Sequence, residues 1–446
     1  MSSVPSVQNS RASLFKQLYS TLFTHIISDY FQAFIKVTTG NLATTFVSLI
    51  TSILIARWVD PHDMGLWNLA LLISAYAPVL QLGVFNGLNR ELPHLLGAGQ
   101  KDHAFKMASA SYAWCSVLTV FSFFVTLCVS AVFLQLKAHL YAQLTIAIGI
   151  VISCSWMTLY LTATYRTSAE WGRLARNSTI IAMLGLLLVL LVRIFGFKGL
   201  ISRAAILAIL GVLALYYKRP IAVSPKWDTS LLLQLAKVGV PIWMLGQLDT
   251  IFMMLDRLTL VKFPDLLGYY TMALQVQTFV CMIPIGFTMV LYPQMAHRYG
   301  ESRKAMDIWW IATKGALAAS FLGVFAGLVG WWLLPKFIIT VIPKYAFGAK
   351  AAQWAAFLGL ARGLSVYNNV YNVIKRQDIY LICLAIGVVA FGGGWILLTK
   401  LLAQQRLLAA VQSSLFSTAV MSISSAILSR SLCSSHDRLA STTASS

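Results

Sequence analysis

Long apolar stretches recur along almost the whole of this 446-residue chain. A helix needs about 20 apolar residues to cross the roughly 30 Å hydrocarbon core of a bilayer, and the stretches have about that length. Hydrophobic residues make up 58 % of the sequence, charged residues make up 11 %, and the mean hydropathy is +0.75. The chain is therefore predicted to be an all-α integral membrane protein with little length left for a soluble domain.

About 12 transmembrane helices are predicted when the apolar runs are separated at the charged residues between them. The junction of the fifth and sixth is crowded by Arg193, Lys198 and Arg203. The predicted spans cover residues 39–58, 66–88, 107–135, 140–164, 177–195, 200–217, 235–260, 268–292, 308–334, 349–373, 378–399 and 407–429.

The loops and tails indicate how the chain is oriented. If the N-terminus is cytoplasmic, the loops and tails on that side hold most of the Lys and Arg outside the spans, so both termini are predicted to be cytoplasmic. Residues 1–38 carry an apolar stripe from Leu18 to Phe34, which predicts an amphipathic helix on the membrane surface. An ordinary cytoplasmic packing helix is the alternative. Residues 430–446 are predicted to form a polar C-terminal tail.

Several function classes are disfavoured by what the chain carries. The net charge of +20 does not indicate nucleic-acid binding, because the Lys and Arg residues are scattered between apolar runs. The 6 cysteines lie singly, without CxxC pairs, so no metal site is predicted. Gly-rich phosphate loops, HExxH and GxSxG are missing, so we predict neither a catalytic site nor a cofactor and do not expect an enzyme.

A repeat relates the two halves of the chain. The stretch DPHDMGLWNLA, residues 60–70, recurs in altered form as FPDLLGYYTMA, residues 263–273. Sliding residues 61–101 along by 203 positions gives nine identities without a gap. Chance similarity between two apolar hairpins is the alternative. Because six predicted spans separate a position from its repeat, the two copies are expected to have the same orientation in the membrane.

The repeat predicts two lobes that pack around a central cavity. Residues 39–217 would form the N-lobe, 218–234 the linker and 235–429 the C-lobe. The first two helices of each lobe would be joined by a tight corner, Pro61 with Gly65 and Pro264 with Gly268. The corner is interpreted as a proline that stops one helix and a glycine that permits a turn with positive φ.

These motifs resemble those of a known superfamily. The segment LIARWVDPHDMGLWNLALLISAYAPVLQLGVFNGLNRELPHLLGAG resembles the first helical hairpin of Wzx-type polysaccharide flippases, in the multidrug/oligosaccharidyl-lipid/polysaccharide exporter superfamily. The segment VGVPIWMLGQLDTIFMMLDRLTLVKFPDLLGYYTMA is similar to the start of their second lobe. The resemblance covers roughly residues 38–105 and 235–305 and otherwise rests on span count and length.

The resemblance implies a function. A Wzx-type flippase moves a polyprenyl-pyrophosphate-linked oligosaccharide repeat unit across the bacterial cytoplasmic (inner) membrane by alternating access. The product feeds surface polysaccharides such as O-antigen or exopolysaccharide. Membrane lipid, glycosyltransferases and a polysaccharide polymerase are then the expected partners, and no nucleic acid is expected.

Ionisable residues inside predicted spans are functional candidates, because each costs about 2.5–3.5 kcal/mol to insert. Asp249 and Asp256 lie seven residues apart in the seventh span, a spacing that would place both carboxylates on one helix face. They are ion-coupling candidates, with structural carboxylates as the alternative. Arg257 directly follows Asp256 and would point about 100° away around the helix, so these two are not expected to pair.

The cationic candidates lie in several spans. Arg362 is in the middle of the tenth span and could bind a pyrophosphate bidentately together with Asn368 and Asn369; an ion pair with Asp249 or Asp256 is the alternative. Arg57 and Arg90 are further candidates because the flippases that the chain resembles have cationic cavities. Both also fit the ordinary placement of basic residues at span ends and in loops.

Other functions remain open at this point. A cation-coupled multidrug exporter of the same fold would favour an acidic, aromatic cavity, and the predicted spans hold few acids relative to cations. A membrane-embedded glycan polymerase or ligase would need a long external loop, and the predicted outer connections are short. A structural membrane protein would explain neither Arg362 nor Asp249.

Overall fold

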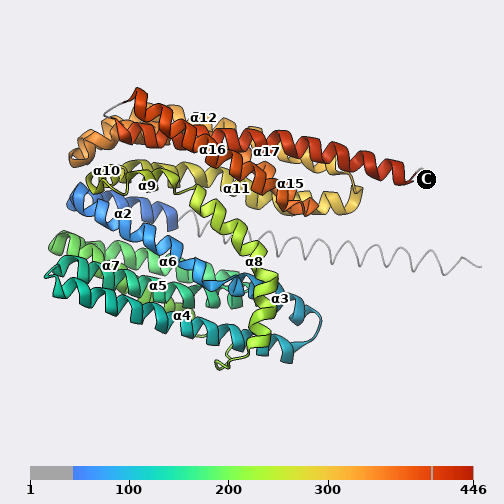
Figure 1. The fold of residues 1–446 in the computed structure, drawn as a ribbon, viewed down its shortest axis with the longest axis horizontal. Coiled ribbons are helices and arrows are strands. Elements are labelled where there is room, and N and C mark those ends of the chain that lie inside the picture. The colour runs from blue at the N-terminus through green and yellow to red at the C-terminus, as the bar shows by residue number, and fades with distance from the viewer. Residues whose placement is uncertain (1–43, 403–404, 445–446) are drawn as a thin grey trace, which may run out of the picture.

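The computed structural model describes residues 44–402 and 405–444, and the regular structure in these ranges is helical (Figure 1). The predicted amphipathic segment 1–38 and the start of the first span lie outside the described residues. The chain thus forms a multi-pass, all-helical membrane protein, as the apolar runs predict.

Among the described residues, nine helical segments are long and apolar enough to cross a membrane. They are α2 with η1 (Pro61–Tyr76, Ala77–Gln81), α4 (Lys101–Gln135), α5 (His139–Thr167), α7 (Val189–Tyr216), α8 (Thr229–Phe252), α10 with α11 (Pro264–Tyr269, Thr271–Ser302), α12 (Ala305–Val341), α16 (Gln377–Leu401) and α17 (Arg406–Ala444). Shorter helices are Thr44–Trp58, α3 (Val84–Gly97), α6 (Trp171–Leu187), α9 (Leu255–Leu260), η2 (Pro343–Gly348), α13 (Ala349–Ala355), α14 (Leu358–Gly363), η3 (Leu364–Tyr367) and α15 (Asn368–Ile374).

The remaining predicted spans correspond to shorter helices. The helix Thr44–Trp58 is the described part of the first span. The fifth span begins with α6, and the chain reverses inside α7 at Gly196, whose φ of 57° and ψ of −130° are not helical. Beyond this turn, the Arg203 Nε donates to the Gly185 carbonyl at 3.0 Å, as expected of two antiparallel helices. The reversal lies between the predicted limits of the fifth and sixth spans.

The tenth span is not the single helix 349–373 that was predicted. It is a chain of short segments, α13, α14, η3 and α15. The break lies where neighbouring helices approach closely, since a Cβ on Gly363 would lie 2.4 Å from the Ser320 Oγ of α12. A Cβ on Gly359 would likewise lie 2.9 Å from the Val280 carbonyl oxygen of α11. Apolar content predicted that this segment spans the membrane but not that its path is broken.

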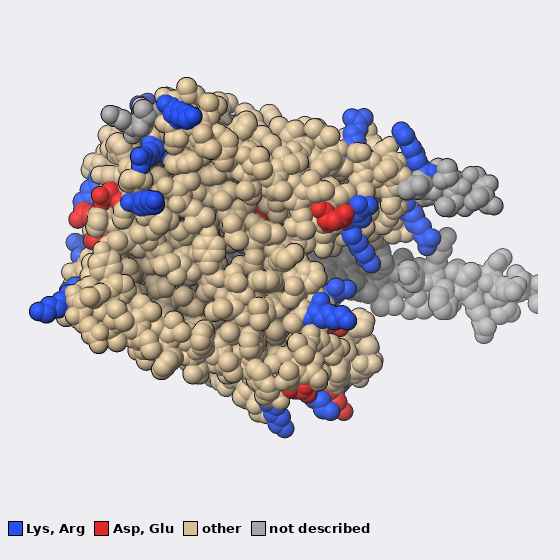
Figure 2. All heavy atoms as spheres, viewed as in Figure 1, with Lys and Arg blue, Asp and Glu red and all other residues tan. Residues whose placement is uncertain are grey.

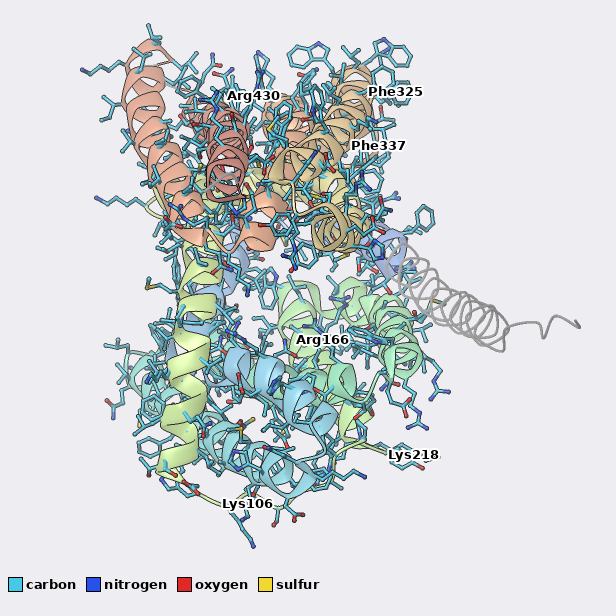
Figure 3. The ribbon with its side chains drawn as sticks, turned by 90° about the vertical axis from the view of Figure 1, so that its right-hand side faces the viewer. Lys106, Arg166, Lys218, Phe325, Phe337 and Arg430 are labelled. Atoms are coloured by element: carbon cyan, nitrogen blue, oxygen red, sulfur yellow. The ribbon has the colours of Figure 1, made fainter. Side chains whose placement is uncertain are left out.

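The helices form two bundles, which we call the N-lobe (the helix Thr44–Trp58 and α2 to α7) and the C-lobe (α9 to α17) (Figures 1 and 3). On the face seen in Figure 2, charged side chains gather at the two ends of the bundles and the surface between them is mostly uncharged. This distribution suits a protein whose middle lies in lipid.

Helix α8 belongs to both lobes (Figure 3). Its Leu232 and Leu235 are buried in the N-lobe core with Trp156. At its other end, Phe252 is buried in the C-lobe core with Leu384. The predicted division into a linker at 218–234 and a C-lobe from 235 therefore does not describe the packing, because the first turns of α8 are N-lobe core.

Asp228 begins helix α8 as its N-cap. Its carboxylate accepts hydrogen bonds from the Ser230 hydroxyl at 2.7 Å and from the backbone amides of Ser230 and Leu231 at 3.0 and 3.1 Å. The Ser230 hydroxyl, followed by the Leu231 amide, lowers the pKa of Asp228 below its usual value of 3.8. Because these donors favour the charged form, the cap is complete at neutral pH.

The two repeated corners contact each other at one end of the molecule. A Cβ on Gly65 of α2 would lie 1.9 Å from the Pro264 carbonyl oxygen, and a Cβ on Gly268 of α10 would lie 1.7 Å from the Pro61 carbonyl oxygen. Each proline is the first residue of its helix, and each glycine lies inside the helix without a positive φ. The predicted positive-φ turn is therefore wrong, because these glycines allow two backbones to touch.

Further repeat mates pair at the same place. The His62 Nδ1 lies 2.6 Å from the Asp265 Oδ1, and the Asn68 Nδ2 donates to the Thr271 Oγ1 at 2.7 Å. Both pairs are separated by 203 residues, which is the offset of the repeat. The halves thus face each other across an approximate two-fold axis. We call this end, where α2, α10 and η2 meet, the closed end.

The C-terminal helix α17 extends to Ala444, so the predicted polar tail 430–446 is helical over its described part. Near its end, the Asp437 carboxylate accepts hydrogen bonds from the backbone amides of Ala305 and Met306 at 2.7 and 3.0 Å. These are the first two amides of α12, which no carbonyl of that helix can accept. The tail thus caps a transmembrane helix.

Candidate binding cavity

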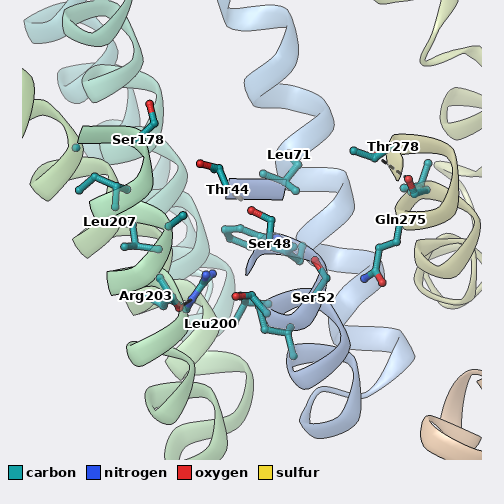
Figure 4. Close-up of a pocket in the computed structure, with 18 of the residues that line it drawn as sticks. Thr44, Ser48, Ser52, Leu71, Ser178, Leu200, Arg203, Leu207, Gln275 and Thr278 are labelled. Carbon is teal, nitrogen blue, oxygen red and sulfur yellow. Dashed lines mark hydrogen bonds between the residues drawn. The ribbon is translucent and has the colours of Figure 1, made fainter. Parts of the chain in front are cut away.

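A cavity of about 740 Å³ lies between the lobes next to the closed end (Figure 4). The N-lobe contributes the helix Thr44–Trp58 together with α2, α5, α6 and α7, and the C-lobe contributes α9 and α11. Its volume falls in the range of about 300–1,000 Å³ that is usual for ligand sites.

Hydroxyl and amide side chains make up almost half of the residues that line the cavity. Several hydroxyls donate to the carbonyl four residues earlier in their own helix, for example Thr51 to Val47 and Thr278 to Leu274, both at 2.8 Å. Their oxygens keep lone pairs that can accept from a ligand. The polar lining residues are Thr44, Ser48, Thr51, Ser52, Asn68, Thr158, Thr162, Asn177, Ser178, Thr271, Gln275 and Thr278.

Two arginines supply the charge of the cavity. Arg203 reaches it from α7 of the N-lobe, and Arg257 reaches it from α9 of the C-lobe. No Asp or Glu is among the described residues that line the cavity. The cavity is therefore cationic, and its two cations come from opposite lobes.

Each arginine is positioned by its local structure. The Arg203 Nε donates to the Gly185 carbonyl of α6, which leaves the terminal nitrogens of the guanidinium available for other acceptors. Arg257 is in the first turn of α9, where the buried Asp256 accepts from the Tyr270 hydroxyl and the Arg257 amide, both at 2.7 Å. Asp256 thus fixes the start of the helix that presents Arg257.

Two sequence-based expectations about these acids are wrong. Asp249 and Asp256 do not share a helix face, because α8 ends at Phe252 and α9 begins at Leu255 after a turn. Asp256 and Arg257 do form a contact, with 3.9 Å between Oδ1 and Nε. The turn explains the first result, since the periodicity argument assumed one unbroken helix.

Asp249 and Arg362 meet in the C-lobe. The Arg362 Nη2 lies 3.7 Å from the Asp249 Oδ1, and the Tyr380 hydroxyl donates to the same oxygen at 2.8 Å. Arg362 is not among the residues that line the cavity. Of the two roles considered for Arg362, the structure thus shows the ion pair with Asp249.

The remaining predicted ligands are dispersed. Asn369 is 3 % exposed and donates to the Thr288 carbonyl of α11 at 3.0 Å, while Asn368 accepts from the Ser425 hydroxyl of α17 at 2.9 Å. Arg57 and Arg90 are exposed, the first next to the closed end and the second on α3. None of these four residues lines the cavity.

Neither of the two cavity arginines was predicted from the sequence to be a ligand. The sequence nevertheless contained a signal for one of them, Arg203. Arg203 lies inside the predicted sixth span, but it was interpreted only as crowding a junction. The cost of inserting a charge makes it as strong a candidate as Arg362. Arg257 could not be placed from sequence, because its direction depends on the break between α8 and α9.

No metal site is indicated among residues 44–402 and 405–444, where no group of three or more His, Cys, Asp or Glu side chains is arranged to hold an ion.

Solved transporters share this fold. An inward-facing multidrug resistance MATE family transporter of the MOP superfamily has a TM-score of 0.71 and 14 % identity over 89 % of this chain and 96 % of its own. An outward-facing MATE family transporter has a TM-score of 0.65 and 14 % identity over 91 % and 96 %. The lipid II flippase MurJ, in an inward closed conformation, has a TM-score of 0.60 and 13 % identity over 87 % and 86 %.

The chain thus has the fold of MOP superfamily transporters, whose solved members include multidrug exporters and a lipid flippase. No protein-family profile matches the sequence, and no curated protein matches it.

Proposed function

We propose that the protein is a flippase for a polyprenyl-pyrophosphate-linked oligosaccharide, working by alternating access in the bacterial inner membrane. The observation that carries the proposal is the chemistry of the cavity, whose described lining residues offer hydroxyls, amides and two guanidiniums but no carboxylate. The fold of MOP superfamily transporters and the Wzx-type motifs support the same function.

The polar lining suits a sugar chain. Each sugar hydroxyl that leaves water loses hydrogen bonds worth several kcal/mol unless the protein replaces them. The Ser, Thr, Asn and Gln side chains of the cavity can donate to and accept from such hydroxyls. The polyprenyl chain would remain in the bilayer while the headgroup crosses inside the protein.

The two arginines suit the pyrophosphate. A guanidinium can donate two parallel hydrogen bonds to one phosphate, a geometry that lysine lacks. Because Arg203 and Arg257 come from different lobes, one diphosphate held by both would connect the lobes. Moving a negative charge outward also gains about 2.3 kcal/mol per charge at 100 mV, so the membrane potential can bias export.

The cavity would open toward the cytoplasm in this conformation. The C-terminal end of α17 lies opposite the closed end (Figure 1), so cytoplasmic termini place the closed end at the outer surface. The TM-score is higher with the inward-facing transporter than with the outward-facing one, 0.71 against 0.65. Glycosyltransferases that supply the lipid-linked glycan and a polymerase that consumes it are the partners that this function requires.

The test uses purified protein in vesicles that contain a fluorescent polyprenyl-pyrophosphate oligosaccharide, with translocation followed by accessibility of the glycan to an external reagent. Arg203→Gln and Arg257→Gln should each slow translocation roughly 10- to 100-fold, because a charge-assisted hydrogen bond contributes about 1.5–3 kcal/mol. Arg57→Gln and Arg90→Gln, which remove exposed arginines outside the cavity, serve as matched controls. Cavity variants that translocate like the controls would contradict the proposal.

A multidrug exporter of the same fold is the second candidate, favoured by the similarity to a multidrug resistance transporter. Cationic drugs would meet two arginines in this cavity and no acid among its described lining residues, which disfavours their binding. Uptake of a labelled cationic drug by the same vesicles, without translocation of the glycan lipid, would decide for this candidate.

A further inference from the structure

A charged cluster outside the cavity connects α8 with two elements of the C-lobe. Asp249 comes from α8, Arg362 from α14 and Tyr380 from α16. The Asp249 carboxylate has Arg362 at 3.7 Å and the Tyr380 hydroxyl at 2.8 Å, both on Oδ1. The Asp249 side chain is 37 % exposed, whereas that of Arg362 is 14 % exposed. The Asp249 carboxylate is therefore accessible, and the arginine that faces it is the more buried partner.

A carboxylate inside a transmembrane helix needs a positive partner, and three kinds are available. A proton or a metal cation from solution can bind and leave, whereas a basic side chain stays with the protein. The Tyr380 hydroxyl donates a hydrogen bond but brings no charge. Arg362 is the basic side chain that lies near Asp249.

The fold holds Arg362 at this position. The break of the tenth span makes α14 a short segment, and both glycines beside Arg362 contact neighbouring helices: Gly359 lies against α11 and Gly363 against α12. The Arg362 guanidinium also contacts the Met253 sulfur, and its Nε has no hydrogen-bond partner among the described residues. The position of the Arg362 backbone thus places its guanidinium next to Asp249 and Met253.

We propose that Arg362 is a tethered counter-ion that takes the place of a coupling cation at Asp249. The protein then binds no Na⁺ at Asp249 during transport. Removing the guanidinium would turn Asp249 and Tyr380 into a site for a small monovalent cation. The inference rests on the proposed function only where it speaks of transport, because the binding claim concerns the purified chain alone.

The test measures thermal unfolding of the purified full chain in NaCl and in choline chloride at equal ionic strength. The unmodified protein should show no Na⁺-specific shift. Arg362→Met, which keeps length and apolar contact, should gain a Na⁺-specific rise of about 2 °C or more at saturating Na⁺. Arg362→Lys keeps the charge and should not respond, and Asp249→Asn with Arg362→Met should lose the response.

Each result decides the question. A Na⁺-specific shift in the unmodified protein that Asp249→Asn abolishes would overturn the inference, as would a folded Arg362→Met variant that does not respond to Na⁺. If Arg362→Met does not fold, adding Asp249→Asn should restore folding, because an uncompensated charge inside a transmembrane helix is then removed. Failure of that rescue would also overturn it. No substrate is used, so a wrong proposed function leaves these outcomes unchanged.

Discussion

Gly65 and Gly268 illustrate how single residues shape the closed end. Each lies inside a helix and touches the backbone of the opposite repeat, and Asn68 bonds to Thr271 one turn further on. Asn68 also donates to the Leu267 carbonyl at 3.2 Å. Small residues permit the approach of the two helices, and a buried amide then fixes their register.

Gly65→Ala should destabilise the closed end. The added Cβ would lie 1.9 Å from the Pro264 carbonyl oxygen, so the two helices must separate at a cost of about 1–3 kcal/mol. Thermal unfolding of the purified protein should show a clear loss of stability. Gly286→Ala is the matched control, because nothing lies within 4 Å of its added Cβ and the change should be neutral or slightly stabilising. Equal stability of the two variants would contradict the close approach.

The apolar content of the sequence predicts whole helices. Contacts with neighbouring helices decide where these helices break and end. The tenth span is broken where α11 and α12 come close to Gly359 and Gly363. Helix α17, in contrast, continues past its apolar part and uses Asp437 to cap α12. Both features depend on residues that are distant in the sequence.

Asp437→Ala should loosen the start of α12. Two backbone amides lose their acceptor, which typically costs about 0.5–2 kcal/mol for a helix N-cap. We expect a lower unfolding temperature and faster proteolysis around residues 303–304. Glu301→Ala, which removes only exposed ion pairs with Arg298 and His297, should change stability by less than about 0.5 kcal/mol. If the Asp437→Ala protein unfolds at the same temperature as the Glu301→Ala control, the cap does not contribute to stability.

The whole molecule consists of two lobes that meet at the closed end and share α8. Two exposed ion pairs connect elements of different halves there. The first is His62 with Asp265, 2.6 Å apart, and the second is Lys344 with Asp60, 2.8 Å apart. Surface ion pairs of this kind contribute little stability, so they would separate readily in the proposed alternating access. Alternating access requires such separation.

Crosslinking the closed end should stop transport. With His62→Cys and Asp265→Cys joined by a short bifunctional thiosulfonate, translocation should fall to the level of protein-free vesicles and return when the crosslink is reduced. Glu170→Cys with Arg173→Cys, which replaces a partly exposed ion pair within the N-lobe, is the control and should remain active after crosslinking. Undiminished translocation by the crosslinked His62/Asp265 variant would show that the closed end does not open.

The sequence by itself determined the helical membrane fold, the approximate spans and the two related halves. These properties depend on run length and on a fixed offset along the chain, both of which are local or periodic signals. Only the tertiary structure decided which side chains meet. Arg203 joins Arg257 in one cavity and Arg362 joins Asp249 in another place, because helix packing sets the direction of each side chain. Contacts between backbones, as at Gly65 and Gly268, leave no periodic signal from which their purpose could be predicted.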